Sequence, residues 1–146
     1  MCKVGDLVVM VVDSNEVDLK RACASLEKLG ITRIVCVYSL KEAIEFLSED
    51  SNIDIVLADY EIEEGKDLGL LLVSVIKQQY PSISIILNAK DYSCSVVLDS
   101  IKRNADDIFN KNVEDDIEQL IGKWITLAQL KIETRELFNG KRSTEA

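Results

Sequence analysis

Two aspartates follow apolar runs that have the length and composition of buried strands. Asp13 follows the run 7–12 (LVVMVV), and Asp59 follows the run 53–58 (IDIVLA). In an open α/β sheet, ligands bind just beyond the carboxyl ends of the strands, where the strand order reverses. Carboxylate oxygens are the ligands that hard cations prefer. The two aspartates therefore predict a hard-cation site, a phosphoryl site, or both.

Strand and helix patterns alternate five times along the chain. The predicted strands are 7–13, 33–38, 53–58, 82–88 and 107–110. The predicted helices are 17–29, 40–47, 67–79, 92–103 and a long helix that begins near residue 113. Short connections between such elements predict βαβ units with right-handed crossovers. We expect an α/β fold in which a five-stranded parallel sheet forms the middle of three layers. This is a doubly wound, flavodoxin-like (βα)5 domain with an extended C-terminal helix.

Residues at the predicted helix ends agree with these elements. Ser14 or Asn15 can cap the first helix, and Ser39 can cap the second. The third helix must stop near Tyr80, because the residue before a proline disfavours helical backbone. Asn104 is suited to a left-handed position at the end of the fourth helix.

Length and charge limit the possible classes of protein. The chain has 146 residues, of which 47% are apolar, so it can bury one substantial core. Its net charge is −9, and an acidic surface of this kind repels nucleic acid. No apolar run approaches the ~20 residues that span a bilayer. Asp6 interrupts the N-terminal segment, which therefore does not resemble a signal peptide. We expect a cytoplasmic protein without direct nucleic-acid or membrane binding.

The cysteines and the missing histidine exclude several kinds of chemistry. The four cysteines are Cys2, Cys23, Cys36 and Cys94, and no pair has C-x-x-C spacing. The chain contains no histidine, so a structural zinc site and Ser-His or Cys-His catalysis are not expected. Cys23 and Cys36 lie within apolar patterns and are predicted to be small core residues.

The order of polar residues after the strands carries a family resemblance. The segments are VVDSNE (11–16), IVLADY (55–60), IILNA (85–89) and NADDIFNK (104–111). The last is similar to G-A-D-D-Y-x-x-K-P. Together they resemble the receiver domain of bacterial response regulators, the phosphoacceptor half of two-component signalling. The resemblance covers about residues 6–125.

The resemblance implies a role for each matching residue. Asp59 would be the phosphoacceptor, and Lys111 would pair first with Asp59 and then with the phosphoryl oxygens. Asp13, Asp59 and the main-chain carbonyl of Glu61 would hold Mg²⁺. Asn88 would stand in the place of the switch Ser/Thr.

The resemblance also implies partners. A histidine kinase or a phosphotransfer protein would donate the phosphoryl group in a phosphorelay. An output domain or a downstream protein would receive the signal. The protein would then be a signalling module and not an enzyme.

Several positions depart from the family pattern. Ser14 replaces the second of two consecutive acids after the first strand, which removes a formal charge from the Mg²⁺ site. Ile108 replaces the switch aromatic, and Asn112 replaces the proline that follows the lysine. The acids that could compensate for Ser14 are Glu16, Glu61, Glu63 and Glu64.

Two alternative functions use the same fold. A nucleotide binder needs a glycine- or hydroxyl-rich loop after the first strand, whereas the loop 13–16 is acidic and lacks glycine. A pseudo-receiver would serve only as a phosphorylation-independent protein-interaction module, and Ser14 and Asn88 favour it. Mg²⁺ binding discriminates between a working receiver and a pseudo-receiver.

The last helix carries two apolar patterns in succession. Its first part is predicted to face the core through Ile117, Leu120, Ile121 and Trp124. The pattern then changes to a/d spacing at Leu127, Leu130, Thr134 and Leu137. We therefore divide the chain into a receiver-like domain (1–125) and a helical extension (126–146) whose polar end from Asn139 frays. The a/d pattern is equally compatible with the seam of a weak parallel homodimer and with a single helix from a longer protein, and we expect at most a weak dimer.

Overall fold

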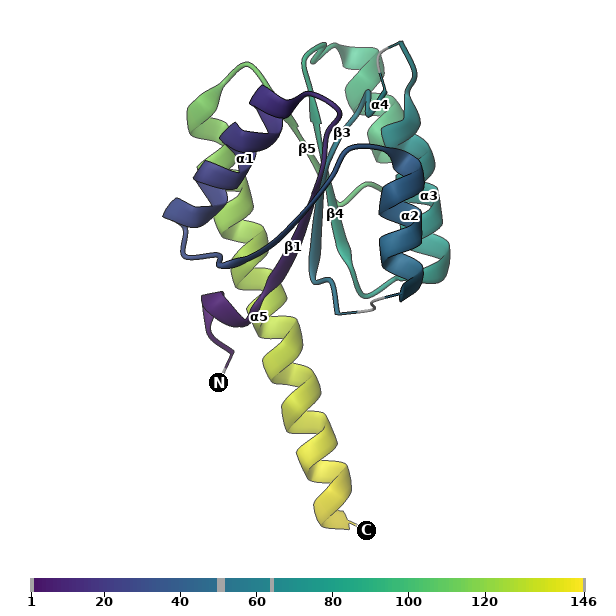
Figure 1. The fold of residues 1–146 in the computed structure, drawn as a ribbon. Coiled ribbons are helices and arrows are strands. Elements are labelled where there is room, and N and C mark those ends of the chain that lie inside the picture. The colour runs from purple at the N-terminus through teal and green to yellow at the C-terminus, as the bar shows by residue number, and fades with distance from the viewer. Residues whose placement is uncertain (1, 50–51, 64, 146) are drawn as a thin grey trace.

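A five-stranded parallel sheet forms the centre of the computed structural model, which describes residues 2–49, 52–63 and 65–145 (Figure 1). The strands are β1 (Val8–Val12), β2 (Arg33–Val37), β3 (Ile55–Asp59), β4 (Ser84–Ala89) and β5 (Asp107–Asn110). Their order in the sheet is β2-β1-β3-β4-β5. The strand order therefore reverses between β1 and β3, because the chain goes from β1 outward to β2 and then crosses back past β1 to β3.

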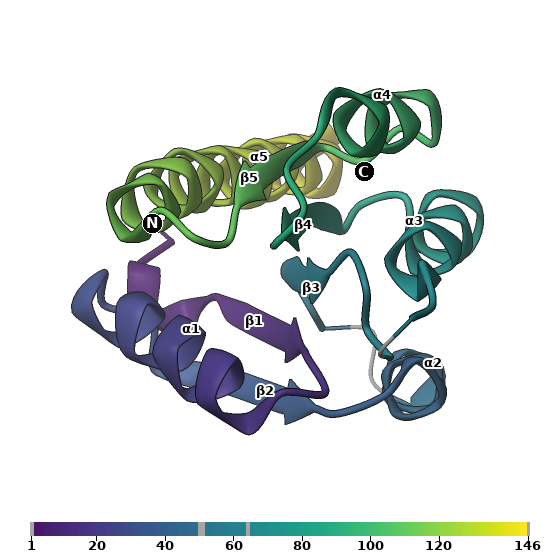
Figure 2. The ribbon, with the colours of Figure 1, turned by 90° about the horizontal axis from the view of Figure 1, so that it is seen from above.

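Helices cover both faces of the sheet. One face carries α1 (Glu16–Lys28) and α5 (Glu114–Glu145), and the other carries α2 (Leu40–Glu49), α3 (Leu68–Gln79) and α4 (Cys94–Lys102) (Figures 1 and 2). A short 3-10 turn, Val4–Asp6, precedes β1. The predicted fold class, a doubly wound three-layer domain, is confirmed.

Each face of the sheet has its own apolar core. Every residue of β3 and β4 is buried, because helices cover both sides of these strands. On the α2–α3–α4 side, Val56, Leu72 and Leu87 are among the buried residues. On the α1–α5 side, Leu26 and Phe109 are buried. This double burial explains why the central strands are almost continuously apolar in the sequence.

The predicted helix ends are confirmed. The Asn15 side chain accepts a hydrogen bond from the main-chain N–H of Asp18 at 3.1 Å. The hydroxyl of Ser39 accepts one from the N–H of Glu42 at 3.1 Å. α3 stops before Tyr80, and Asn104 has a positive φ of 67°. These ends fix the lengths of the helices and so the positions of the strands that follow them.

The prediction that Cys36 is a core residue is wrong. Cys36 is exposed, whereas Cys23 is partly buried against the α1–α5 core. β2 lies at the edge of the sheet, and only Val37 among its five residues is buried. An apolar run on an edge strand is covered less completely than a run on a central strand.

α5 begins on the domain and continues past the sheet (Figure 1). Ile117 and Ile121 are buried in the α1–α5 core, and Trp124 packs against it. Packing continues at Ala128, which is 3% exposed. The side chain of Gln129 donates a hydrogen bond to the carbonyl of Cys2 at 3.1 Å. The helix extends to Glu145, beyond the position where the composition predicts fraying.

Within the described ranges, no helix has both the length and the apolarity needed to span a bilayer.

Candidate functional site

Asp13 and Asp59 lie at the point where the strand order reverses. Val12 of β1 pairs with Ala58 of β3, so the residues that follow them meet at the same edge of the sheet. Each aspartate accepts a hydrogen bond from the backbone two residues further on. Oδ1 of Asp13 accepts from the N–H of Asn15 at 2.9 Å, and Oδ1 of Asp59 accepts from the N–H of Glu61 at 3.1 Å. These turns fix the direction of both carboxylates.

Lys111 joins the two aspartates. Its main-chain N–H donates to the carbonyl of Ala89 at 2.9 Å, which holds the end of β5 against β4. Its ammonium Nζ then reaches Oδ2 of Asp13 at 2.7 Å and Oδ2 of Asp59 at 2.9 Å. All three side chains are buried. Residues that are 98 and 52 positions apart in the sequence therefore form one ionic cluster.

Asp18 is a third carboxylate in this cluster, and its place in the sequence does not predict this role. Its Oδ2 forms an ion pair with Nζ of Lys111 at 2.9 Å and lies 3.5 Å from Nζ of Lys90. In sequence, Asp18 is an ordinary acid in the first turn of a helix. The only sequence feature that points to the ionic cluster is the position of Asp18 in the first helical turn after a strand that is followed by an acid.

The acids proposed to compensate for Ser14 have other contacts. Glu16 pairs with Lys20 on the exposed face of α1 at 3.4 Å. Oε1 of Glu61 accepts from the N–H of Gly65 at 2.9 Å. Glu63 pairs with Lys66 at 3.7 Å. Glu64 lies outside the described residues. Of the nearby acids, Asp18 therefore brings the additional carboxylate into contact with Lys111.

Burial and pairing shift the pKa values within the cluster. Burial raises the pKa of Asp59, the charge of Asp13 adds to this effect, and the hydrogen bond from Lys111 only partly opposes it. Burial also acts to raise the pKa of Asp18, but Lys111 and Lys90 outweigh it and the pKa is lowered. The pKa of Lys111 is raised, because its three carboxylate partners outweigh its burial. The charge of Asp59 is therefore less well compensated than that of Asp18.

Asn88 lies beside Asp59 on the neighbouring strand. The two residues are partners in the register of β3 and β4, and the carbonyl of Asn88 accepts from the N–H of Tyr60 at 2.7 Å. The side chain is 4% exposed, and its Oδ1 has no hydrogen-bond partner among the described residues. Buried amides are normally satisfied, so this oxygen can still accept a hydrogen bond or bind a cation.

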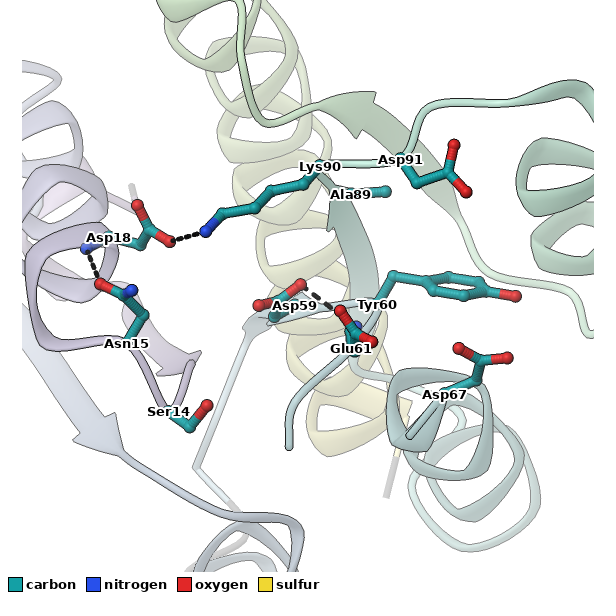
Figure 3. Close-up of a pocket in the computed structure, with 10 residues that line it drawn as sticks. All are labelled: Ser14, Asn15, Asp18, Asp59, Tyr60, Glu61, Asp67, Ala89, Lys90 and Asp91. Atoms are coloured by element: carbon teal, nitrogen blue, oxygen red, sulfur yellow. Dashed lines mark hydrogen bonds and ion pairs between the residues drawn. The ribbon is translucent and has the colours of Figure 1, made fainter. Parts of the chain in front are cut away.

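A pocket of about 540 Å³ opens beside Asp59 (Figure 3). Figure 3 shows Asp59 at the centre of the lining residues, with Lys90 extending toward Asp18. The lining residues are Ser14, Asn15, Asp18, Asp59, Tyr60, Glu61, Asp67, Ala89, Lys90 and Asp91. Acidic side chains outnumber the two lysines of the site, Lys90 and Lys111. A free anion would be repelled by this pocket unless a cation entered with it.

The oxygen donors of the pocket fit Mg²⁺ and not a softer metal. In the part of the chain that the structure describes, no three His, Cys, Asp or Glu side chains are arranged as a complete metal cage. Mg²⁺ does not need one, because it binds through one or two carboxylates and keeps several waters or substrate phosphate oxygens. Asp59 lines the pocket, and Asp13, which is not itself a lining residue, is joined to Asp59 through Lys111.

Gly69 allows α3 to pack against the loop that follows Asp59. Its N–H donates to the carbonyl of Tyr60 at 3.0 Å. A Cβ atom at this position would lie 2.6 Å from the carbonyl oxygen of Asp59 and 2.8 Å from Cα of Tyr60. Both obstructing atoms belong to the backbone, so a larger side chain would have to displace the loop.

We therefore predict that Gly69→Ala lowers the free energy of unfolding by about 2 kcal/mol, the usual cost of overpacking a buried site. Urea denaturation measures this change. Gly122→Ala is the matched control, because a Cβ atom on α5 at that position meets no atom within 4 Å. The control should gain up to about 1 kcal/mol, since alanine is the better helix former. Equal effects of the two substitutions would contradict the close approach at Gly69.

The fold and the acidic site agree with what the comparison with protein families finds. The chain belongs to the response regulator receiver domain family, whose model matches residues 9–123. A search among curated proteins finds no match.

Solved structures of the same fold are numerous. A response regulator from Thermotoga maritima is 25% identical with a TM-score of 0.71, and the match covers 82% of this chain and 98% of that one. NtrX from Brucella abortus is 19% identical with a TM-score of 0.74, covering 88% of this chain and 28% of that one. A structure described as a fusion with the trimeric coiled coil of yeast Spc42 is 19% identical with a TM-score of 0.76. That match covers 99% of this chain and 95% of that one.

Proposed function

We propose that this receiver domain accepts a phosphoryl group on Asp59 with the help of Lys111 and Mg²⁺. The observation that supports this most strongly is the position of Lys111. Its Nζ contacts Asp13 and Asp59 at 2.7 and 2.9 Å, next to an acidic pocket at the switch point of the sheet. A lysine held between two carboxylates can remain in contact when one of them becomes a phosphorylated carboxyl group.

In the proposed reaction, a carboxylate oxygen of Asp59 attacks the phosphorus of a donor phosphohistidine. The O–P bond of an acyl phosphate forms, the P–N bond of the donor breaks, and the donor imidazole retains the bonding electron pair. Lys111 neutralises charge on the phosphoryl oxygens, and the amide of Asn88 donates a hydrogen bond to one of them. When bound, Mg²⁺ would be held by Asp13, Asp59 and the carbonyl of Glu61, and it would supply further charge neutralisation. The domain is modified once and transforms no other substrate, so we do not class it as an enzyme.

The alternative is a pseudo-receiver that uses only its surface. Ser14 and Asn88 favour this alternative, as does an ionic cluster that is already paired through Lys111. Mg²⁺ and beryllofluoride, a phosphoryl mimic, separate the two functions. Trp124 is the only tryptophan, and its indole N–H donates to Asp107 on β5 at 2.8 Å, so it reports on the strand that directly precedes Lys111. A saturable fluorescence change with both reagents supports phosphoacceptance, whereas no change in fluorescence or in the NMR spectrum supports the pseudo-receiver.

Ser14→Asp should tighten Mg²⁺ binding. Ser14 lines the pocket and contributes no charge, and an added carboxylate strengthens a hard-cation site. We expect the Kd for Mg²⁺, measured by titration of Trp124 fluorescence, to fall roughly tenfold, which corresponds to about 1.4 kcal/mol. Ser95→Asp adds the same charge at an exposed position on α4 and should leave the Kd nearly unchanged. Equal affinities of the wild type and Ser14→Asp would mean that Asp18 already fills this role.

The donor and the recipient of the signal follow from the proposed chemistry. We propose a histidine kinase or a phosphotransfer protein as donor. The recipient would be an output domain or a separate protein, an arrangement consistent with the receiver-like part occupying 28% of the NtrX chain. A cytoplasmic location, a boundary near residue 125 and the lack of direct nucleic-acid binding remain predictions.

The end of α5 should mediate a weak parallel homodimer. Leu130 and Leu137 are 52% and 76% exposed, and Leu130 lines a shallow groove of about 400 Å³ together with Leu127 and Thr134. Burial of these exposed leucine side chains against a second helix would remove apolar surface from water and so stabilise the association. Sedimentation should show a concentration-dependent dimer that Leu130→Glu converts to monomer. Leu71→Glu, a control at an exposed leucine on α3, should not change the association. A wild type that stays monomeric at high concentration contradicts the homodimer.

A further inference from the structure

The thiols of Cys23 and Cys36 lie side by side, outside the acidic pocket. Cys23 belongs to α1 and Cys36 to the edge strand β2, and their Sγ atoms are 3.3 Å apart. Figure 2 shows α1 lying along β1 and β2. The two other cysteines lie elsewhere in the structure, because Cys2 is buried near α5 and Cys94 is exposed at the start of α4. Cys23 and Cys36 are thus two thiols in contact and not isolated cysteines.

The two thiols differ in their access to solvent. Cys36 is exposed, whereas Cys23 is partly buried. Both line a shallow cavity of about 290 Å³ that Leu19, Glu27 and Tyr38 also line. Burial and the neighbouring Cys36 raise the pKa of Cys23 to about 12. A reagent in solution therefore meets Cys36 first, and Cys23 remains a protonated thiol at the sulfur of Cys36.

We propose that Cys23 and Cys36 form a reversible disulfide site that responds to small disulfide oxidants such as oxidised glutathione. The thiolate of Cys36 attacks one sulfur of the oxidant and releases one glutathione thiolate. The thiol of Cys23 then loses its proton to solvent and attacks Sγ of Cys36, which releases the second glutathione. Two protein thiols are oxidised by two electrons in total, and one disulfide is reduced to two thiols.

The bond would tie α1 covalently to the edge of the sheet. It closes the segment 23–36, a loop of the length for which a disulfide stabilises a fold appreciably. The thermal unfolding midpoint of the oxidised protein should therefore rise by roughly 5–10 °C. Since α1 also carries Asp18, oxidation would fix the helix that supplies one of the three carboxylates to Lys111.

The test uses the full chain, reduced and then treated with excess oxidised glutathione. Remaining thiols are alkylated, and intact mass and non-reducing peptide maps are recorded. We expect an intramolecular link between the peptides that contain Cys23 and Cys36, with Cys2 and Cys94 alkylated. Dithiothreitol should reverse both the link and the shift in midpoint. Cys94→Ser is the matched control and should form the same link.

Variants that lack one of the two thiols separate the attack of Cys36 on the oxidant from the attack of Cys23 on the mixed disulfide. Cys23→Ser should stop at a stable mixed disulfide between glutathione and Cys36. Cys36→Ser should be modified much more slowly at position 23, and circular dichroism establishes that each variant is folded. The proposal is overturned if the wild type keeps both thiols alkylatable, if it links Cys36 to any other cysteine, or if it forms only intermolecular disulfides.

Discussion

Replacing Asp59 with asparagine is expected to abolish phosphoryl uptake. With Mg²⁺ and acetyl phosphate as a small phosphodonor, the wild type should gain the mass of one phosphoryl group, and Asp59→Asn should gain none. The amide cannot form an acyl phosphate by the proposed attack, because it lacks the carboxylate nucleophile. Intact-mass spectrometry measures the change directly, without a partner protein.

The loss of phosphoryl uptake is informative only if Asp59→Asn remains folded. The direction of the pKa shift of Asp59 predicts that the variant is stable. Folding raises the pKa of Asp59, so the charged carboxylate opposes folding above that pKa, and its unfavourable effect lessens as the pH falls through it. A neutral asparagine removes this opposition at neutral pH. The unfolding midpoint of Asp59→Asn without Mg²⁺ should therefore be equal to or higher than that of the wild type.

Asp67→Asn provides a matched control for the phosphoryl experiment. It removes one charge from the lining of the same pocket, but Asp67 is not among the ion-pair partners of Lys111. This variant should still take up the phosphoryl group. Uptake by Asp59→Asn at the wild-type level would show that another residue is the acceptor.

Lys111→Met should destabilise the protein strongly. The substitution leaves Asp13, Asp18 and Asp59 without the ammonium that contacts all three. Removing one partner of a buried ion pair typically costs about 3–5 kcal/mol, because the remaining charges stay buried and unpaired. We expect the free energy of unfolding in urea at neutral pH to fall by about 3 kcal/mol. Added Mg²⁺ should recover part of this loss.

The pH dependence of the same variant follows from the same charges. Without Lys111, the three carboxylates repel one another, and this repulsion destabilises the folded state. The difference in the free energy of unfolding between the wild type and Lys111→Met should therefore shrink as the pH falls through the carboxyl range, because protonation removes the repulsion. Lys90→Met is the control, since Lys90 is 61% exposed and its pair with Asp18 is worth less than about 1 kcal/mol. A Lys111→Met protein as stable as this control would contradict the central position of Lys111.

The sequence predicts the order and type of the elements well because the local signals agree. Strands buried on both faces have continuous apolar runs, and Tyr80 and Asn104 mark where α3 and α4 stop. The exposure of Cys36 is not predictable from the run that contains it. It depends on β2 being at the edge of the sheet, which is a property of the strand order.

The same distinction applies to the site. Asp13 and Asp59 can be recognised because each directly follows a strand, and Lys111 because it follows the last strand. Asp18 cannot be recognised in this way, because its contact with Lys111 depends on how α1 lies over the sheet. The free oxygen of Asn88 likewise results from register and burial together.

Phosphoryl acceptance by Asp59 is tested most directly by locating the modification in the wild-type protein. After incubation with Mg²⁺ and acetyl phosphate, borohydride reduces an aspartyl phosphate to homoserine, which peptide mass spectrometry places at a single residue. We expect homoserine at position 59, and only when both Mg²⁺ and the phosphodonor are present. Homoserine at another aspartate, or none at any position in a protein that binds Mg²⁺, would contradict phosphoryl acceptance by Asp59.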